Sequence, residues 1–274
     1  MAGVSSESLA AALAALEAKL PSASLQLAEE LFGILGTVDS SAGLRRALTD
    51  PSRSGDEKSA LVKQLFGGKV SADAVEIAGG LASSRWASAR DIGDALETLA
   101  ASVVIAVAEN KSAVSASGLT GLESLENDLF AFNQSVESSH EVQRALSEPQ
   151  ASPAAKVSLA EKLVPGASKE AKVLIGQAVT APRGLKVTRL VGRFAELAAK
   201  RQQRWIATVS VTRPLTETQT SRLQVGLNAL YGRELKINMN VDPALIGGIR
   251  IQVGDEVVDA SVLGRLGELQ RQLA

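Results

Sequence analysis

VDPALIGGIRIQVGDEVVDASVLGRLGELQRQL, spanning residues 241–273, decides how the C-terminal part of the chain folds. Apolar residues occupy alternate positions in Ile249–Val253, which is the period of a half-buried β-strand. Gly254 and Asp255 then predict a tight turn, and 256–258 predict a short return strand. The stretch is therefore expected to contain a β-hairpin.

The same stretch carries stop and turn signals on both sides of this hairpin. Asp242 and Pro243 end the segment that precedes it, and the paired glycines Gly247 and Gly248 suggest positive φ angles or a close approach of two backbones. After the hairpin, Ser261–Leu273 places leucines on one stripe and predicts a closing helix. The residues indicate structure here and mark out no catalytic side chain.

Two further strands are predicted upstream. Trp205–Thr212 alternates apolar and polar residues, and Glu234–Val241 does the same. Between them Thr216 and Gln219 have the spacing of a capping box, which predicts the start of a helix. Together with the final stretch, these segments predict a small α+β unit of three or four strands and two helices.

The first 200 residues contain an internal duplication. Residues 31–66 align without gaps on residues 129–164, with 13 of 36 positions identical, and the alignment includes Arg46 with Arg144 and Pro51 with Pro149. After a one-residue slip the pattern continues. The two copies are therefore expected to be equivalent helical units.

Each copy has the same helix signals. Ser54 in the first copy and Ser152 in the second are predicted N-caps, and Ser71 and Ser168 are expected to begin a fifth element. Leucines of Ser6–Leu20 form one stripe and predict an N-terminal helix. The second copy has no obvious counterpart of that helix, and the tail of a helix over 96–110 is the candidate for its place. Ser- and Gly-rich residues 112–121 are the predicted linker.

These patterns predict a mainly α protein with a C-terminal α+β domain, in which two tandem helical bundles precede a small mixed sheet with two helices. The expected domains are residues 1–111 (first copy), 122–204 (second copy) and 205–274 (the α+β domain).

Composition argues against most kinds of chemistry. The chain has 274 residues, 45% of them apolar, a net charge of −1, no Cys and a single histidine, His140. A cysteine or paired-histidine metal site is excluded, and no basic block suggests nucleic acid. Gly67-Gly68-Lys69 lacks the spacing of a phosphate loop and is interpreted as a helix terminus. No catalytic residue, cofactor site or metal site is predicted.

No membrane segment is predicted either. The most apolar run, Leu99–Ala108, is about half of the ~20 residues that cross a bilayer, and no secretory signal precedes it. We therefore expect a soluble chain that reaches a membrane only through partners.

A dense set of residues near the C-terminus carries a resemblance to a known family. They are Asp242-Pro243, Leu245-Ile246-Gly247-Gly248-Ile249, Ile251, Val253-Gly254-Asp255, Val258-Asp259, Ser261 and Gly264-Arg265-Leu266. This set resembles the C-terminal signature of the delta subunits of F-type ATP synthases, which are similar to the mitochondrial oligomycin-sensitivity-conferral protein. The motif Arg144-Ala145-Leu146, Pro149, Ser152 and Lys156 fits the helical domain of the same family. The extra helical copy is similar to the elongated delta proteins of actinobacteria.

The resemblance implies a non-catalytic subunit of the peripheral stalk, in a hetero-oligomeric complex at the cytoplasmic face of the bacterial cell membrane. It implies that N-terminal helices of the alpha subunits bind the first and fifth helices, and that the C-terminal domain grips the b-type subunit. The candidate partner-binding residues are Leu9, Leu13, Leu16, Val75, Ile77 and Leu81, and the signature residues are Asp242, Pro243, Leu245, Gly247, Gly248, Gly254 and Asp255. Nucleic-acid binding and direct membrane insertion are not implied.

Two alternatives remain open from the residues alone. A freestanding helical adaptor would explain the repeat and the missing chemistry but not the C-terminal signature. An enzyme would need a polar pocket near Gly247 and Gly248, where the sequence offers mainly aliphatic side chains.

Overall fold

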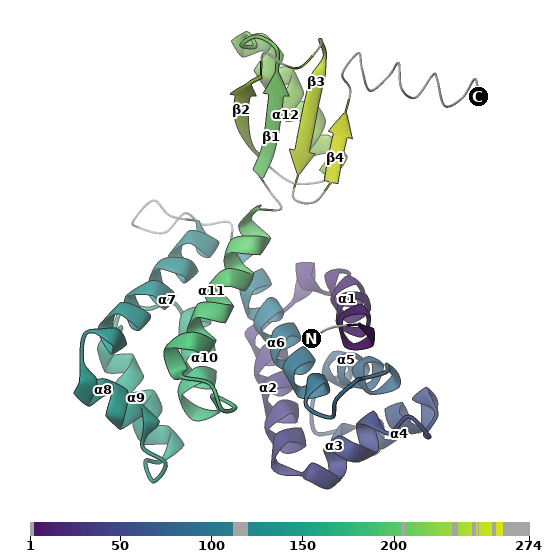
Figure 1. The fold of residues 1–274 in the computed structure, drawn as a ribbon, viewed down its shortest axis with the longest axis vertical. Coiled ribbons are helices and arrows are strands. Elements are labelled where there is room, and N and C mark those ends of the chain that lie inside the picture. Colours follow the sequence, from purple (N-terminus) through teal and green to yellow (C-terminus); the bar gives the residue numbers. More distant parts are fainter. Residues whose placement is uncertain are drawn as a thin grey trace. The chain divides into compact units, whose positions relative to one another are not determined.

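The computed structural model describes residues 3–111, 120–203, 206–231, 235–242, 245, 247–253 and 256–259. The chain divides into two compact units, Met1–Ala198 (unit 1) and Ala199–Ala274 (unit 2). Unit 1 is helical and unit 2 contains the sheet, so the predicted fold class is confirmed (Figure 1). The finer division at 1–111, 122–204 and 205–274 stays a prediction.

The helices of unit 1 follow one another in two sets. The first set is α1 (Val4–Glu17), η1 (Leu20–Ser22), α2 (Leu25–Ser40), α3 (Ala42–Thr49), α4 (Gly55–Phe66), α5 (Ala72–Ser83) and α6 (Asp91–Glu109). The second set is α7 (Gly121–Glu137), α8 (His140–Ser147), α9 (Pro153–Leu163), α10 (Lys169–Thr180) and α11 (Val187–Gln203). Helices α2–α6 and α7–α11 thus occur in the same order, as the duplication predicts.

Equivalent residues make the same contacts in both copies. Ser54 and Ser152 cap α4 and α9, each accepting a hydrogen bond of 3.2 Å from the third backbone N–H. The backbone N–H of Ser71 donates to Glu30 (3.0 Å), and that of Ser168 donates to Asp128 (2.8 Å). The Ser71 hydroxyl also donates to Glu30 and holds the pKa of that carboxyl below its usual value. The alignment of the two copies therefore extends to their polar contacts.

Helix α6 belongs to both copies. It packs against α2 on one side and against α7 and α10 of the second copy on the other. Its buried residues include Leu96, Leu99, Val103, Val104 and Ile105, all at most 3% exposed. The apolar run in this part of the sequence is thus the shared centre of unit 1.

The end of α6 takes the place of α1 in the second copy. At the end of α1, Lys19 forms an ion pair of 2.6 Å with Asp73 in the first turn of α5. After α6, Lys111 forms an ion pair of 2.7 Å with Glu170 in the first turn of α10. The repeated ion pair supports the prediction that the tail of α6 takes the place of a first helix in the second copy.

Two predicted boundaries were wrong. The N-terminal helix begins at Val4 and ends at Glu17, and Leu20 lies in a short 3-10 turn with Pro21 at its start. Gly121, expected in the linker, is the first residue of α7, because Thr120 accepts the backbone N–H of Glu123 in a capping box (3.3 Å). Residues 112–119 of the linker lie outside the described residues.

Unit 2 is a four-stranded sheet with a helix against one face (Figure 1). Its elements are β1 (Ile206–Val211), α12 (Glu217–Tyr231), β2 (Lys236–Val241), β3 (Ile249–Val253) and β4 (Glu256–Asp259), and the strand order is β2-β1-β3-β4. Strands β1 and β2 are parallel, while β3 is antiparallel to both β1 and β4. Ala207, Val209 and Val211 are buried with Leu227 of α12.

The predicted elements of unit 2 are confirmed where they are described. The capping box holds, since the backbone N–H of Gln219 donates to the Thr216 hydroxyl (3.3 Å). The predicted turn at Gly254 and Asp255, the closing helix Ser261–Leu273 and Trp205 lie outside the described residues.

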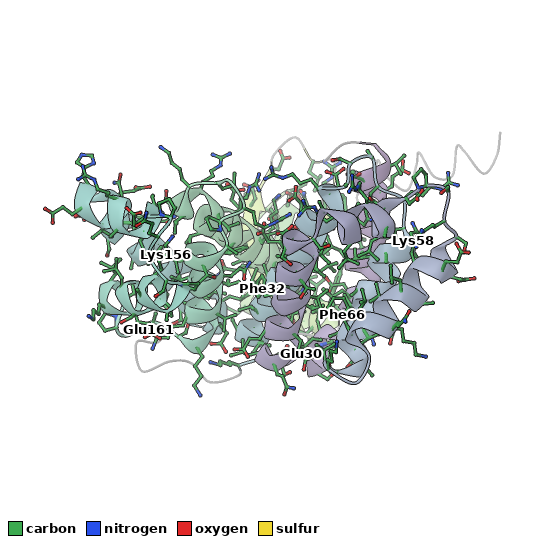
Figure 2. The ribbon with its side chains drawn as sticks, turned by 90° about the horizontal axis from the view of Figure 1, so that it is seen from below. Glu30, Phe32, Lys58, Phe66, Lys156 and Glu161 are labelled. Atoms are coloured by element: carbon green, nitrogen blue, oxygen red, sulfur yellow. The ribbon has the colours of Figure 1, made fainter. Side chains whose placement is uncertain are left out.

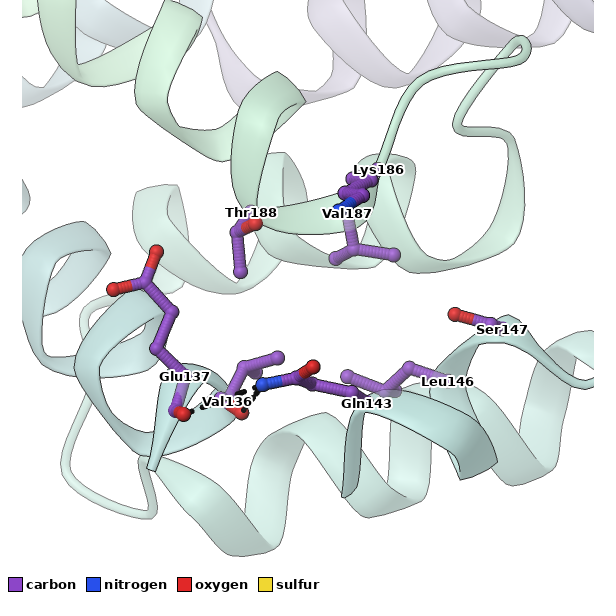
Figure 3. A pocket seen from close by; sticks show the side chains of 8 residues that line it. All are labelled: Val136, Glu137, Gln143, Leu146, Ser147, Lys186, Val187 and Thr188. Carbon is purple, nitrogen blue, oxygen red and sulfur yellow. Dashed lines mark hydrogen bonds between the residues drawn. The ribbon is translucent and has the colours of Figure 1, made fainter. Parts of the chain in front are cut away.

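The two copies differ in the side chains that surround the C-terminal ends of α2 and α7. In the second copy an open cavity of about 330 Å³ is lined by Val136 and Glu137 of α7, residues of α8, and Lys186, Val187 and Thr188 (Figure 3). The Gln143 side chain donates to the backbone oxygens of Val136 (3.1 Å) and Glu137 (3.2 Å) at its floor. In the first copy, Arg45 donates to the equivalent oxygen of Asp39.

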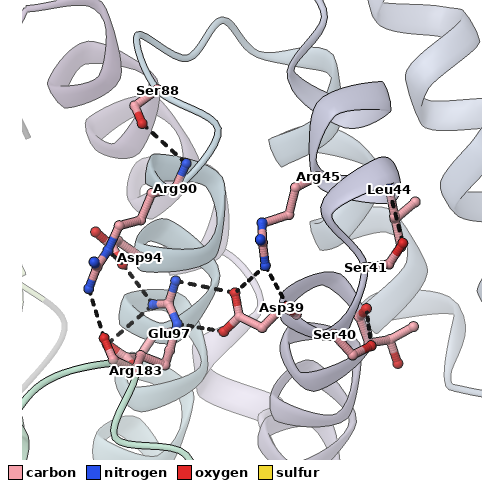
Figure 4. Close-up of polar contacts among 11 residues, drawn as sticks. Asp39, Ser40, Ser41, Leu44, Arg45, Ser88, Arg90, Asp94, Glu97 and Arg183 are labelled. Carbon is pink, nitrogen blue, oxygen red and sulfur yellow. Dashed lines mark hydrogen bonds and ion pairs between the residues drawn. The ribbon is translucent and has the colours of Figure 1, made fainter.

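The first copy has a larger open cavity at the equivalent place, about 560 Å³, and its lining includes Arg183, from the turn between α10 and α11. Its guanidinium reaches Asp39 of α2 (2.6 Å) and Asp94 of α6 (2.7 Å), and lies 3.7 Å from Glu97 (Figure 4). Arg183 has a left-handed backbone with φ of 51°, and Gly184 follows with φ of 81°. This arginine of the second copy therefore joins two helices of the first.

Burial makes this contact sensitive to charge. Burial lowers the pKa of Arg183, but Asp39, Glu97 and Asp94 together raise it above its usual value. Burial raises the pKa of Glu97, and the positive charge of Arg183 opposes that rise. Removal of Arg183 would take away the cation that lies 3.7 Å from the buried Glu97 carboxylate and break the short ion pairs to Asp39 and Asp94.

Figure 2 shows how closely side chains fill unit 1. At Gly93 the packing is tight, because an added Cβ would lie 2.4 Å from an Arg183 nitrogen and 3.3 Å from an Asp39 oxygen. Gly93 therefore makes room for the guanidinium.

We expect Arg183→Met to destabilise unit 1 by about 3 kcal/mol at neutral pH, since it removes one partner of a buried ion cluster. Burial already raises the pKa of Glu97, and loss of the Arg183 charge that opposes this rise would raise it further. The destabilising effect of this carboxyl should therefore shrink as pH falls through that raised pKa. Urea unfolding followed by circular dichroism measures this. Arg90→Met is the control, because Arg90 is 61% exposed and lies 3.8 Å from Asp94, and it should change stability by less than about 1 kcal/mol.

We expect Gly93→Ala to destabilise the protein by about 1–3 kcal/mol, because the methyl group displaces the Arg183 guanidinium. Gly36→Ala in α2 is the matched control, since no atom lies within 4 Å of an added Cβ there. It should stabilise the protein by up to about 1 kcal/mol through helix propensity. Equal melting temperatures for the two variants would contradict this account.

Candidate partner-binding surfaces

Helices α1 and α5 form one surface of the first copy. They pack against each other, and the half-buried side chains Leu9, Leu13, Val75 and Ile77 lie between them and the core. The outer side of α1 carries exposed alanines at 10, 11, 14 and 15. Small side chains of this kind allow the backbone of another helix to approach closely.

The six candidate residues do not lie at one depth. Leu16 and Leu81 are buried, each 2% exposed, so they support the α1–α5 surface from beneath. The other four are partly accessible. The structure thus brings the six together on two adjacent helices, and the partner contact itself stays a prediction.

Charges border this surface. Lys19 pairs with Asp73 (2.6 Å) and Glu76 (3.0 Å), and these hydrogen bonds raise the pKa of the Lys19 ammonium. Both carboxylates are more than half exposed, so the pairs contribute little to stability. They fix the spacing of α1 and α5 at one end.

The equivalent surface of the second copy is covered. There α6 and α10 correspond to α1 and α5, and α2 packs against both. The helix of the first copy therefore occupies the groove between them. Of the two equivalent surfaces, the one at α1 and α5 has no helix of the described chain across it.

The signature residues of unit 2 form the connection from β2 to β3. The backbone N–H of Asp242 donates to Val211 at the end of β1 (2.9 Å), and that of Leu245 donates to Asp242 (3.2 Å). Gly247 and Gly248 have φ of 68° and 82°, which confirms the predicted positive φ angles. These residues carry the chain across the end of β1. Pro243, Gly254 and Asp255 lie outside the described residues.

Unit 2 also exposes apolar side chains. Met239 and Val241 on β2 are 47% and 46% exposed, and they share the face of β2 that lies beside α12, with Thr220 of α12 in contact with Met239. Val225 and Leu230 of α12 and Val257 and Val258 of β4 are exposed as well. Groups of this kind are typical of partner contacts.

His140, the pair Gly67-Gly68 and Trp86 have structural positions. His140 is the exposed first residue of α8. Gly67 and Gly68 end α4, with φ of 74° at Gly68. The Trp86 indole donates to the backbone oxygen of Leu81 (2.8 Å) and packs on the core. In the part of the chain that the structure describes, no three His, Asp or Glu side chains gather as a metal site would require.

Among the described helices, none combines the length and the apolar composition that a bilayer crossing needs.

Sequence reasoning missed Arg183 and the exposed pair on β2. Pro182-Arg183-Gly184 reads as a turn, and one sequence gives no sign that the charge of such a turn is buried. Met239 and Val241 were predicted as the apolar face of a strand, but their exposure depends on β2 being an edge strand.

Comparisons with known proteins agree with the fold. The model of the family described as ATP synthase delta (OSCP) subunit matches residues 105–273. The match begins inside α6, so it takes in the end of that helix, the second copy and unit 2.

Curated relatives match over the whole chain. A protein named ATP synthase subunit delta from Arthrobacter sp. (strain FB24) is 90% identical over 100% of both chains. Proteins of the same name are 65% identical in Renibacterium salmoninarum, over 100% of both chains, and 38% identical in Streptomyces coelicolor, over 100% of this chain and 98% of that one. The first copy is therefore shared by these relatives.

Among solved structures, a chain of the Toxoplasma gondii mitochondrial ATP synthase hexamer matches at a TM-score of 0.34 and 18% identity, over 63% of this chain and 94% of that chain. This likeness is too low to support a structural argument. The family model and the full-length relatives suffice: the chain belongs to the ATP synthase delta (OSCP) subunit family.

Proposed function

We propose that this protein is a non-catalytic component of the peripheral stalk of an F-type ATP synthase. It links the catalytic head to the b-type stalk subunit and resists the torque of the rotor during ATP synthesis. The observation that carries the proposal is the presence of two compact units, each with its own accessible apolar side chains. Membership of the delta family gives those surfaces their proposed partners.

The proposed site for the N-terminal helices of the alpha subunits is the surface of α1 and α5. Half-buried apolar side chains and exposed alanines provide a surface on which an amphipathic helix can pack. The equivalent surface of the second copy, formed by α6 and α10, is already in contact with α2. The first copy is thus the one that meets alpha.

The proposed site for the b-type subunit is the apolar surface of unit 2. Met239 and Val241 lie on an edge strand, where a partner can bury them without disturbing the core.

A stalk must hold persistently while the rotor turns. Nanomolar binding corresponds to about −12 kcal/mol, and two weaker contacts on one chain reach such a grip through effective concentration. Two units with separate partners supply this arrangement. The protein would lie at the cytoplasmic face of the membrane, held there by its partners.

We expect Leu13→Asp together with Val75→Asp to weaken binding to a peptide of the alpha N-terminus at least about tenfold, because both substitutions place a charge in the apolar surface of α1 and α5. Isothermal titration with the full chain measures this. Ala145→Asp on the exposed face of α8 is the control. Unchanged affinity in a double variant that melts normally would remove α1 and α5 as the alpha site.

We expect Met239→Asp together with Val241→Asp to reduce binding to the cytoplasmic part of the b-type subunit at least about tenfold. Asn240→Asp is the matched control, since Asn240 lies between them on β2, is exposed and faces the opposite side of the sheet. Equal loss in the control would show that charge on the strand, rather than the apolar surface, is responsible.

A further inference from the structure

The two copies treat one aromatic position differently. Phe32 of α2 and Phe130 of α7 are equivalent in the duplication. Phe32 is 8% exposed, whereas Phe130 is 66% exposed. A phenylalanine kept at this exposure on a helix surface marks a place where apolar contact is missing.

The first copy shows what covers this position. Phe32 and Asp39 are seven residues apart, so they lie on the same face of α2. Helix α2 packs against α10, and Asp39 binds Arg183, which follows α10 in the chain. Figure 2 shows Phe32 in the middle of unit 1, between the two copies. The occupant there is a helix followed by an arginine.

The second copy presents the same face without an occupant in the described chain. Phe130 and Glu137, the counterpart of Asp39, again lie seven residues apart on one face of α7. Glu137 is exposed, and Figure 3 draws no contact to its carboxylate. The cavity of about 330 Å³ begins at Glu137. The first copy also has an open cavity at this place, and there Asp39, the counterpart of Glu137, is paired with Arg183.

Charge near the cavity also suits an incoming cation. The first copy carries Arg45 and Arg90 beside Arg183, and the second copy has Gln143 and Thr188 at the equivalent positions. Lys186 is the basic residue among those that line the cavity. Glu126, one turn before Phe130, adds a carboxylate where α2 has Ala28, and one of its oxygens is buried without a hydrogen-bond partner.

We propose that the face of α7 centred on Phe130 and Glu137 binds an amphipathic helix of a neighbouring subunit of the ATP synthase complex, with an arginine at its C-terminal end that enters the cavity beside Glu137. The helix packs its apolar side on Phe130, in the way that α10 packs against α2. This inference rests on membership of the complex and is independent of the alpha and b sites proposed above.

The test uses the assembled complex, purified with this chain carrying the photo-crosslinking residue p-benzoylphenylalanine in place of Phe130. Irradiation and mass spectrometry should show a crosslink to a helical segment of another subunit, within about one turn of an arginine. The same residue in place of Lys63, which is exposed on α4, is the position control and should not reach that segment.

Glu137→Arg in the photo-crosslinking chain should lower the crosslink yield about tenfold or more, because it sets like charges against each other. Glu141→Arg, on exposed Glu141 of α8, is the matched charge reversal and should leave the yield unchanged.

Three results would overturn the inference. They are no crosslink from position 130 in an intact complex, a crosslink to a second copy of this chain, and a crosslink to a segment that is not helical or has no arginine. Absence of the chain from the purified complex is a different result, and it would refute the proposed function instead.

Discussion

Helix α6 is apolar on nearly every side because two sets of helices share it. It packs against α2 in the first copy and against α7 and α10 in the second, and Ala100, Val103, Val104 and Ala106 are fully buried. Small residues let three neighbouring helices approach it closely. Unit 1 is therefore one core built from two copies, and neither copy would keep its interior covered without this helix.

The shared helix explains why equivalent surfaces differ. A duplicated unit begins with two equal grooves, α1 with α5 and the end of α6 with α10. Packing of the copies places α2 over the second groove, whereas no described helix crosses the first. In the same way Phe32 is buried and Asp39 is paired with Arg183, while Phe130 and Glu137 stay exposed. Duplication thus produced new exposed faces as well as a longer chain.

The Arg183 cluster specifies how the copies meet. Buried ion pairs stabilise little compared with apolar packing, because desolvation offsets much of their attraction. They depend strongly on geometry, however, since a shifted guanidinium would lose its short contacts to Asp39 and Asp94 and its place beside the buried Glu97. The left-handed backbone at Arg183 costs about 1–2 kcal/mol, and the ion pairs offset it. The ion cluster therefore defines one geometry for the joint between the copies.

Local patterns in the sequence determined the elements of this protein. Period-two alternation predicted β1 to β3, serine caps predicted where α4, α5, α9 and α10 begin, and the paired glycines predicted positive φ angles in the connection after β2. The in-register repeat predicted two equivalent sets of helices, and the C-terminal signature indicated the family that the comparisons confirm.

Only the tertiary structure decided how the copies pack. It placed the end of α6 in the position of a missing first helix, buried the charge of Arg183 and left Phe130 exposed where Phe32 is buried. The physical reason is one of range. Caps, turns and strand alternation involve residues a few positions apart, so they can be recognised from short stretches of sequence. Burial depends on which distant helix packs against a surface. Equivalent residues in the two copies have the same local sequence pattern, whether or not another helix covers them.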